Sequence, residues 1–385
     1  GSLALDANTT GSQNNAVGYN ALTANTTGIN NDAHGHASML SNTSGSYNIA
    51  MGRASLDANT SGSNNIALGP FALTSNTTAT HNVAIGYETL EQNTTGTQNV
   101  AVGNFALDDN VDGSNNSAFG YASLGKNTSG DFNAAFGHGA LAKNTTANNN
   151  TAVGTDSLRE NTTGAGNTGV GHDALKSNTS GAHNTALGDQ SLDANTSGTR
   201  NTAIGESSLG SNTTADFSVA VGYQALSSNT TGLSNVAVGA QALKATVTGS
   251  SNTAVGRSCL QSNTASNNTA IGNRALFVNT IGANNVAVGA NSLDANTTGG
   301  GNSAFGQNSL TANTTGYNNT GLGQEALRQN TEGFENVSVG RASMEENTTG
   351  DNNVAVGNKA LQKNTTADDN TAVGNFALNQ NTTGT

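Results

Sequence analysis

The sequence predicts an all-β fold, a parallel β-solenoid (β-roll) in which each repeat forms one coil. Three observations support this prediction. A glycine recurs every 17 residues from Gly1 to Gly256 and again from Gly272 to Gly374, which gives 23 units in 385 residues. The unit is too short for a pair of helices, since helical repeats need about 33 residues or more. Most units also contain N-T-T-G or a close variant of it, such as N-T-S-G, together with a second asparagine, residue types that disfavour helix.

Counted from the recurrent glycine, the unit reads G-x-x-A-L-x-x-N-T-T-G-x-x-N-T-A-V. Position 1 predicts a tight turn, since glycine adopts positive φ at little cost. Positions 8 to 11, N-T-T-G, predict a further turn. The segment N-T-A-V predicts a short strand with positions 15 and 17 on one face and 14 and 16 on the other. The segment x-A-L-x predicts a second short strand. The turn glycines include Gly18, Gly52, Gly69, Gly86 and Gly103.

Large apolar residues recur at positions 5 and 17, and we expect both to form the core. Position 5 is leucine except at Met39 and Met344, and position 17 is apolar except at His34. Position 16 is always small, whereas charged residues fall mainly at positions 2, 3, 6, 7, 12 and 13, which should face solvent. The expected core includes Leu22, Leu56, Leu73, Leu90, Val17, Ile85 and Val102.

Two asparagine positions predict ladders along the stack. Position 8 is Asn in 22 of 23 units, with Thr246 the exception, and position 14 is Asn in 21 of 22, with Ser218 the exception. Stacked asparagine amides can donate to one neighbour and accept from the other. Threonine at position 9 predicts a parallel ladder of hydroxyls. The predicted structural asparagines include Asn8, Asn25, Asn42, Asn59, Asn76 and Asn93 at position 8, and Asn14, Asn31, Asn48, Asn65, Asn82 and Asn99 at position 14.

The repeat predicts a single domain over residues 1–385, with about 23 coils and no separate caps. The last unit stays close to the consensus as far as Thr385. The chain is therefore expected either to be a fragment of a longer fibre or to stack end to end with other copies. Two large apolar side chains per coil are few for a stable core. Joining several thin coils side by side would bury more apolar surface, so we expect a homotrimer.

Composition excludes several classes of protein. Charged residues make up 10% of the chain, against about 25% in ordinary soluble domains. The net charge of −12 argues against nucleic-acid binding, which needs a basic surface. No run approaches the 18 apolar residues of a membrane-spanning helix, so no membrane insertion is expected. The single cysteine, Cys259, cannot form a disulfide within the chain, and at position 4 it fits a small packing residue.

Several segments resemble a known surface-protein motif. Asn82–Gly86 reads N-V-A-I-G, Asn99–Gly103 reads N-V-A-V-G and Asn201–Gly205 reads N-T-A-I-G. They are similar to the N-S-V-A-I-G motif of trimeric autotransporter adhesin heads, and the longer unit resembles repeats of phage tail fibres. This resemblance covers essentially the whole chain. It implies a trimeric, left-handed parallel β-roll that acts as an extracellular fibre or adhesin, on a cell surface or a virion.

Few residues suggest chemistry. Asp108, Asn110 and Asp112 have the spacing of the first calcium ligands of an EF-hand loop, but Phe119 stands where the final glutamate belongs. They are a weak calcium candidate in an otherwise ordinary N-T-T-G turn. His34 is interpreted as a local irregularity, with a buried polar or metal role at a trimer axis as the alternative. No catalytic residues and no cofactor are predicted.

The favoured function is therefore a non-enzymatic fibre segment or adhesin, with itself and a host-surface receptor or glycan as partners. The first alternative is an ice-binding solenoid. Regular threonine ranks would carry that function, and Thr9, Thr26, Thr60 and Thr77 form one such rank. A subunit that stacks into filaments is a further alternative. An enzyme such as a polysaccharide lyase is disfavoured, because the charged residues are scattered.

Overall fold

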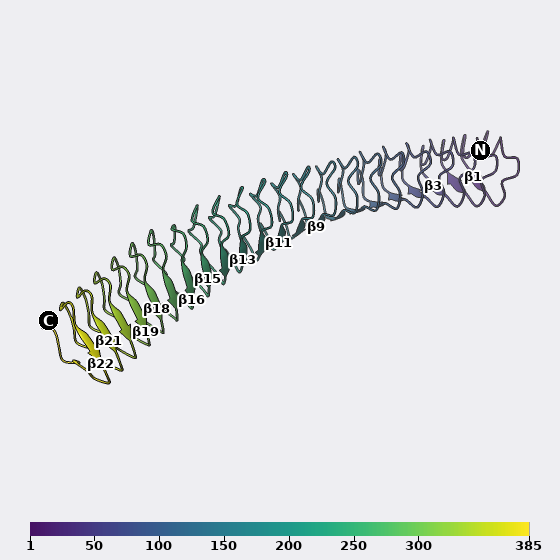
Figure 1. Ribbon diagram of the computed structural model, residues 1–385. Coiled ribbons are helices and arrows are strands. Elements are labelled where there is room, and N and C mark those ends of the chain that lie inside the picture. The colour runs from purple at the N-terminus through teal and green to yellow at the C-terminus, as the bar shows by residue number, and fades with distance from the viewer. Residues whose placement is uncertain (385) are drawn as a thin grey trace. The chain divides into compact units, whose positions relative to one another are not determined.

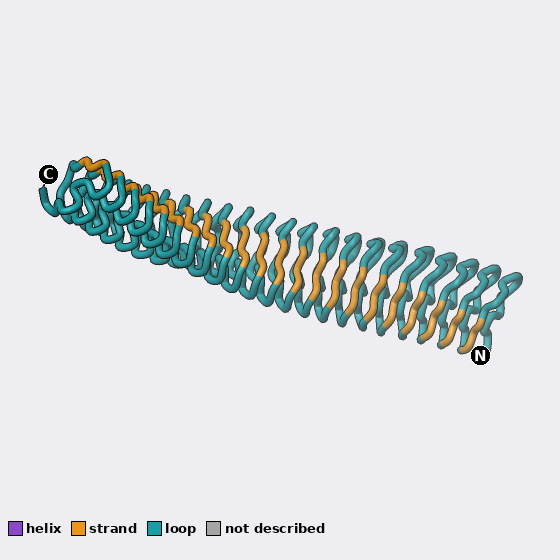
Figure 2. The backbone as a smooth tube through the Cα atoms, turned by 90° about the horizontal axis from the view of Figure 1, so that it is seen from below, coloured by secondary structure: helices purple, strands orange, loops and turns teal. Residues whose placement is uncertain are grey.

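The computed structural model describes residues 1–384, and these residues form short strands and turns with no helix (Figure 2). There are 22 strands of three residues each, one per coil, at positions 15 to 17 of the repeat. The chain divides into two compact units, Gly1–Ser197 and Gly198–Thr385. The prediction of an all-β solenoid is confirmed.

The first unit contains the first eleven strands. They are β1 (Asn15–Val17), β2 (Asp32–His34), β3 (Ile49–Met51), β4 (Ile66–Leu68), β5 (Val83–Ile85), β6 (Val100–Val102), β7 (Ser117–Phe119), β8 (Ala134–Phe136), β9 (Thr151–Val153), β10 (Thr168–Val170) and β11 (Thr185–Leu187). The second unit contains β12 (Thr202–Ile204), β13 (Val219–Val221), β14 (Val236–Val238), β15 (Thr253–Val255), β16 (Thr269–Ile271), β17 (Val286–Val288), β18 (Ser303–Phe305), β19 (Thr320–Leu322), β20 (Val337–Val339), β21 (Val354–Val356) and β22 (Thr371–Val373).

Within each unit, consecutive strands pair in parallel and in register with the repeat. Ala16 pairs with Ala33, and Ala33 pairs with Ala50. The arrows of neighbouring coils therefore follow one another along one side of each unit (Figure 1). The pairing places equivalent repeat positions directly above one another, so each repeat position becomes a row of similar side chains.

The one shortened repeat keeps the sheet in register. Residues 256–271 form a unit of 16 residues, yet Thr253 still pairs with Thr269. The missing residue is taken from the turn. There the Asn263 Nδ2 group donates to the carbonyl of Ala265 at 2.8 Å, two residues on, where other coils span three. The turn thus absorbs the deletion and the strands do not shift.

The interior of each coil is narrow. The position 5 leucines predicted as core, Leu22, Leu56, Leu73 and Leu90, are fully buried, and so are the position 16 alanines. The prediction for position 17 is wrong. Val17 is 52% exposed, Ile85 is 37% exposed and Val102 is partly exposed. Strand alternation turns positions 14 and 16 inward, where the space suits alanine, and it turns positions 15 and 17 outward.

The predicted second strand does not form. Positions 2 to 7 are turns, and positions 3 and 5 have a left-handed backbone, with φ of +55° at Asn20 and +53° at Leu22. This conformation costs a non-glycine residue roughly 1–2 kcal/mol. Two contacts hold Leu22 in it. Its side chain is fully buried, and its N–H donates to the carbonyl of Ser38 in the next coil at 2.9 Å.

The position 1 glycines occupy a conformation that requires glycine. Their φ values include +143° at Gly18, +145° at Gly52, +137° at Gly69, +139° at Gly86 and +131° at Gly103. A Cβ atom on Gly18 would also collide with the carbonyl of Gly35 in the next coil. Because that neighbour is backbone, no side-chain movement could relieve the collision. Both constraints explain why position 1 does not vary.

Candidate functional site

The position 8 asparagines form a buried ladder through the first unit. Asn25 Nδ2 donates to Asn8 Oδ1 of the preceding coil at 2.9 Å and to the carbonyl of Gly28 at 3.1 Å. The same amide-to-amide bond recurs from coil to coil as far as Asn195, at 2.7 to 3.1 Å. From Asn25 onward these side chains are fully buried. They hold adjacent coils together and are not accessible to a ligand.

The position 14 asparagines form a second ladder of a different kind. The main-chain N–H of Asn31 donates to Asn14 Oδ1 at 3.0 Å, and Asn14 Nδ2 donates to the carbonyl of Gly28 at 2.8 Å. The bond from main-chain N–H to amide oxygen repeats at Asn48, Asn65, Asn82 and Asn99, at 2.9 to 3.1 Å. Both ladders donate to the carbonyl of Gly28, so this turn is fixed from two sides.

The threonines at position 9 bond to the backbone and not to one another. The Thr9 hydroxyl donates to the carbonyl of Thr26 at 2.8 Å, and the Thr60 hydroxyl donates to the carbonyl of Thr77 at 3.1 Å. Thr26 and Thr77 repeat the pattern toward their own next coils. This rank therefore lies on the N-T-T-G turn, away from the sheet. Its hydroxyl protons are already donated in hydrogen bonds to backbone carbonyls.

One residue interrupts the position 8 ladder in the second unit. Thr246 replaces asparagine, and its hydroxyl donates to the carbonyl of Asn263 at 2.7 Å. A threonine at this place has no amide N–H to offer to the preceding coil. Asn229 Oδ1 is accordingly buried without a hydrogen-bond partner. Such an unsatisfied buried acceptor costs about 1–3 kcal/mol.

The outward face of the strands, formed by positions 15 and 17 and called the sheet face below, is almost free of charge. Among the 22 strands of residues 1–384, only β2 carries charged residue types there. These are Asp32 and His34, whose Oδ1 and Nε2 atoms lie 2.9 Å apart. His34 thus lies on the outer surface of the coil, half-exposed. Elsewhere the sheet face exposes large apolar side chains such as Met51 (45%) and Leu322 (48%).

A second surface, formed by the outward-facing residues at positions 2, 3, 6 and 7 and called the ridge below, carries a run of aromatic rings in the first unit. Phe71, Tyr87, Phe105, Tyr121 and His138 come from five consecutive coils. Their ring centroids are 6.1, 5.6, 5.6 and 5.4 Å apart in that order. This run was not among the residues predicted to be functional. The signal was an aromatic residue at position 2 or 3 in five successive units.

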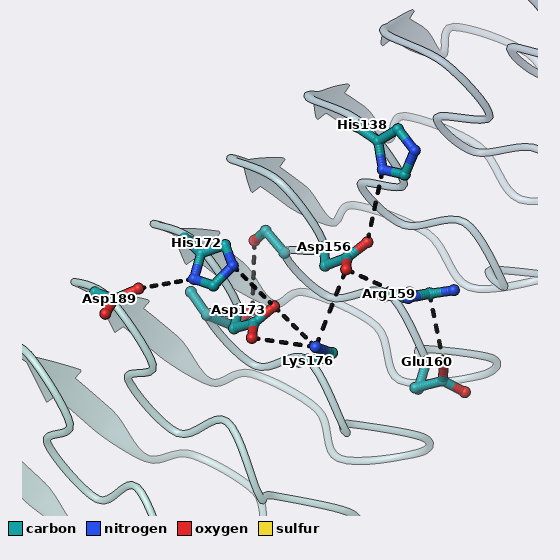
Figure 3. A network of polar contacts seen from close by, with 10 residues as sticks. His138, Asp156, Arg159, Glu160, His172, Asp173, Lys176 and Asp189 are labelled. Atoms are coloured by element: carbon teal, nitrogen blue, oxygen red, sulfur yellow. Dashed lines mark hydrogen bonds and ion pairs between the residues drawn. The ribbon is translucent and has the colours of Figure 1, made fainter.

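A charged network continues the ridge beyond the aromatic run (Figure 3). His138 Nδ1 lies 4.0 Å from Asp156 Oδ1, and Arg159 Nη1 lies 3.3 Å from Asp156 Oδ2. His172 Nδ1 lies 2.9 Å from Asp189 Oδ1. Further members are Lys176, Asp173 and Glu160. The bases of these pairs are exposed, whereas the carboxylates of Asp156 and Asp173 are largely buried, at 16% and 14% exposure. The network pairs acids with bases along the surface.

A pocket of about 350 Å³ opens on the ridge between the aromatic run and this network. Phe105 and Tyr121 line one part of it, and Gly125 and Ala142 occupy position 6 of two successive coils, where they fill little space. Asp108 also lines it. Burial, and secondly the charge of the adjacent Asp109, raise the pKa of the Asp108 carboxyl to about 6.

The three residues of the calcium candidate have separate roles. Asn110 is fully buried in the ladder, where its Nδ2 donates to Asn93 Oδ1 and its Oδ1 accepts from Asn127 Nδ2, both at 2.8 Å. Its amide oxygen is therefore not available as a calcium ligand. Asp108 lines the pocket and Asp112 is exposed. Within residues 1–384, no group of three or more His, Cys, Asp or Glu side chains could hold a metal ion.

Cys259 is a buried packing residue. Its Sγ atom donates to the carbonyl of Ala270 at 3.1 Å, and burial raises the pKa of its thiol to about 12. The thiol is therefore protonated at neutral pH, where a nucleophile would need the thiolate.

Comparison with known proteins adds no functional information. No protein-family model matches the chain, and a search of characterised proteins finds no match. In the part of the chain that the structure describes, no helix has the length and apolar character needed to span a bilayer. The two outward surfaces, the sheet face and the ridge, are the candidate sites of function.

Proposed function

We propose that this chain is a non-enzymatic structural fibre segment or adhesin of an extracellular appendage, a cell surface or a phage tail fibre. In this proposal three copies associate through the sheet face. The observation that carries the proposal is the almost uncharged outward face of a parallel sheet, which within residues 1–384 exposes large apolar side chains at position 17, such as Met51 and Leu322. Parallel sheets occur almost always with both faces covered. Large exposed apolar surfaces mark interaction sites.

Repetition favours another copy of the same chain as the partner. The outward pair in β5 is Val83 and Ile85, and the outward pair in β6 is Val100 and Val102. Each coil thus presents nearly the same surface as the next. Copies related by a rotation axis along the stack would meet the same pattern at every coil, which is the condition for a closed symmetric assembly.

The acids and bases of the ridge support a non-enzymatic role. His172 is paired with Asp189, and Lys176 is paired with Asp173 at 3.1 Å. Each of these two bases is partly exposed to solvent and has a carboxylate beside it, an arrangement in which a general acid or base would contribute little. The buried thiol of Cys259 is protonated at neutral pH.

The mass of the purified chain in solution tests the proposal. Light scattering should give three times the chain mass of 38.3 kDa. The triple variant Ile85→Lys, Val102→Lys and Phe136→Lys places three cations on the sheet face and should give the mass of one chain. The matched control Thr95→Lys, Gln98→Lys and Ser129→Lys adds the same charge at exposed positions off the sheet face and should remain trimeric. A wild-type mass of 38.3 kDa would refute the assembly, and an unlimited mass would favour end-to-end stacking.

Ice binding is the second candidate, and one observation favours it. Thr151, Thr168 and Thr185 lie in register at position 15 of β9, β10 and β11, on the outward side of the sheet. A flat, regularly spaced row of threonines suits an ordered solid better than the Thr9 rank on the turn does. A thermal-hysteresis assay separates the candidates. Hysteresis together with a single-chain mass would support ice binding and overturn the trimeric fibre.

A further inference from the structure

We propose that the pocket formed by Phe105, Tyr121, Gly125 and Ala142 on the ridge of the first unit binds a neutral saccharide. The pocket lies on the ridge, away from the sheet face, so the inference does not depend on the trimer. It adds a ligand-binding site to a chain whose repeat otherwise has a structural role.

The pocket exists because of four successive residues at position 6. Asp108 and Arg159 stand at its two ends, and between them the same position holds only Gly125 and Ala142. A glycine and an alanine between two larger residues leave a hollow about two coils long. Its volume of about 350 Å³ falls in the lower part of the range of roughly 300–1,000 Å³ seen for small-molecule sites.

The rings of Phe105 and Tyr121 supply an apolar surface for a sugar. Their centroids are 5.6 Å apart with an interplanar angle of 77°, and Tyr121 is 52% exposed. Each ring is held by its neighbours in the aromatic run, so little conformational entropy remains to be lost on binding. An exposed tyrosine combines an apolar face, which can pack on the C–H groups of a pyranose, with a hydroxyl that can hydrogen-bond.

The charges around the pocket favour a neutral ligand. Lys126 Nζ lies 2.8 Å from Asp109 Oδ2, and Lys143 Nζ lies 2.6 Å from Glu160 Oε2. Arg159, which also lines the pocket, is paired with Asp156. Because each cation already has a carboxylate partner, an anionic ligand would have to displace an existing ion pair.

Hydrogen-bonding capacity nevertheless remains, and it is of both kinds. The lysine and arginine side chains carry more N–H groups than one carboxylate can accept from. Asp108, which also lines the pocket, adds a carboxylate acceptor, whereas its Oδ1 atom is itself buried without a hydrogen-bond partner within the described chain and out of reach of a ligand. A sugar hydroxyl both donates and accepts, so it could donate to Asp108 and accept from Lys126 or Lys143. This mixture of donors, an acceptor and aromatic faces matches a polyhydroxylated ring.

Binding of the purified full-length chain to immobilised oligosaccharides tests the proposal. The panel holds neutral hexose and N-acetylhexosamine oligomers beside sialylated and sulfated ones. The wild type should bind at least one neutral oligomer in preference to the acidic ones. Tyr121→Ala should weaken that binding at least tenfold, and Ala142→Gln should do the same by filling the hollow. Circular dichroism establishes that each variant remains folded.

Tyr19→Ala is the matched control. Tyr19 is also an exposed tyrosine at position 2, stacked on a histidine of the next coil, and it does not line the pocket. Its variant should bind as the wild type does. No binding to any neutral oligomer, a preference for acidic ones, or an equal loss in Tyr19→Ala would each overturn the proposal. The triple lysine variant of the sheet face should still bind, which separates failure of this site from failure of the assembly.

Discussion

Two stretches of the buried asparagine ladder differ by one residue, and the difference shows how the ladder works. From Asn25 to Asn178, each amide donates to the coil before it and accepts from the coil after it. At Thr246 this exchange stops, and the Oδ1 atom of Asn229, one coil earlier, has no hydrogen-bond donor. A ladder residue therefore stabilises the preceding coil as well as its own. A substitution in one coil should be measurable in the next.

Introducing a charge into the regular stretch should have the largest effect. Asn127→Asp removes the amide that donates to Asn110 Oδ1 and to the carbonyl of Gly130, and it buries a carboxylate in its place. We expect a loss of about 3–5 kcal/mol, typical of an uncompensated buried charge. Urea unfolding measures the loss, and amide hydrogen exchange should locate it in the neighbouring coils. Ser129→Asp adds the same charge at an exposed position and should change stability by less than about 0.5 kcal/mol.

Moving the natural interruption into the regular stretch should have an intermediate effect. Asn127→Thr recreates the Thr246 arrangement and leaves Asn110 Oδ1 without its donor. The expected loss is about 2 kcal/mol, the cost of one buried unsatisfied acceptor. Hydrogen exchange should accelerate around Asn110 more than around Asn144. Equal acceleration of hydrogen exchange around Asn110 and Asn144 would contradict the prediction that loss of a ladder amide mainly destabilises the preceding coil.

Repairing the interruption should have a smaller effect of the opposite sign. Thr246→Asn supplies the missing donor to Asn229 Oδ1 and gives up the hydroxyl bond to the carbonyl of Asn263. We expect a net gain of about 1 kcal/mol. The midpoint of urea unfolding should rise for this variant. Unchanged stability would mean that the orphaned oxygen of Asn229 carries no cost.

Substitution of Asp108 should have the smallest effect on stability. Like Asn229, it has a buried oxygen without a hydrogen-bond partner, but the carboxyl group of Asp108 can be protonated. The pKa of this carboxyl is raised to about 6, so between about pH 4 and pH 6 the folded chain binds more protons than the unfolded chain. Stability should therefore fall as pH rises through this interval. Asp108→Asn should reduce the slope of the melting temperature against pH. Burial also raises the pKa of Asp57, Asp193 and Asp351, so some slope should remain.

The sequence was sufficient to predict the coil, the register of its strands and the two rows of asparagine amides. The fixed glycine and the two asparagine positions each have one physical role in a parallel stack, so their spacing determined where they lie. The inward or outward sense of Val17, Ile85 and Val102 could not be obtained in this way. Alternation defines two faces of a strand without saying which one is inside. The small residues at position 16 were the better indicator of the buried face, because the space at this position suits alanine and not valine.

Two further features depend on tertiary packing. The left-handed backbone at Leu22 contradicts the ordinary preference of leucine, and burial with inter-coil hydrogen bonds overrides that preference. The pocket depends on which side chains from several coils become neighbours. Gly125 and Ala142 gain significance only once position 6 is known to form a continuous row beside the aromatic rings. Composition and spacing within a single repeat carry no such information.

The asparagine ladder of the first unit also has a direction. Every Nδ2–H···Oδ1 bond from Asn25 to Asn195 points toward lower residue numbers, so the amide dipoles add up as peptide dipoles do in a helix. Hydrogen bonds in such a chain polarise one another. A coil can extend this array only in the same orientation, because an inverted coil would bring donor against donor or acceptor against acceptor. Stacks built from this repeat should consequently have a polarity, with two chemically different ends.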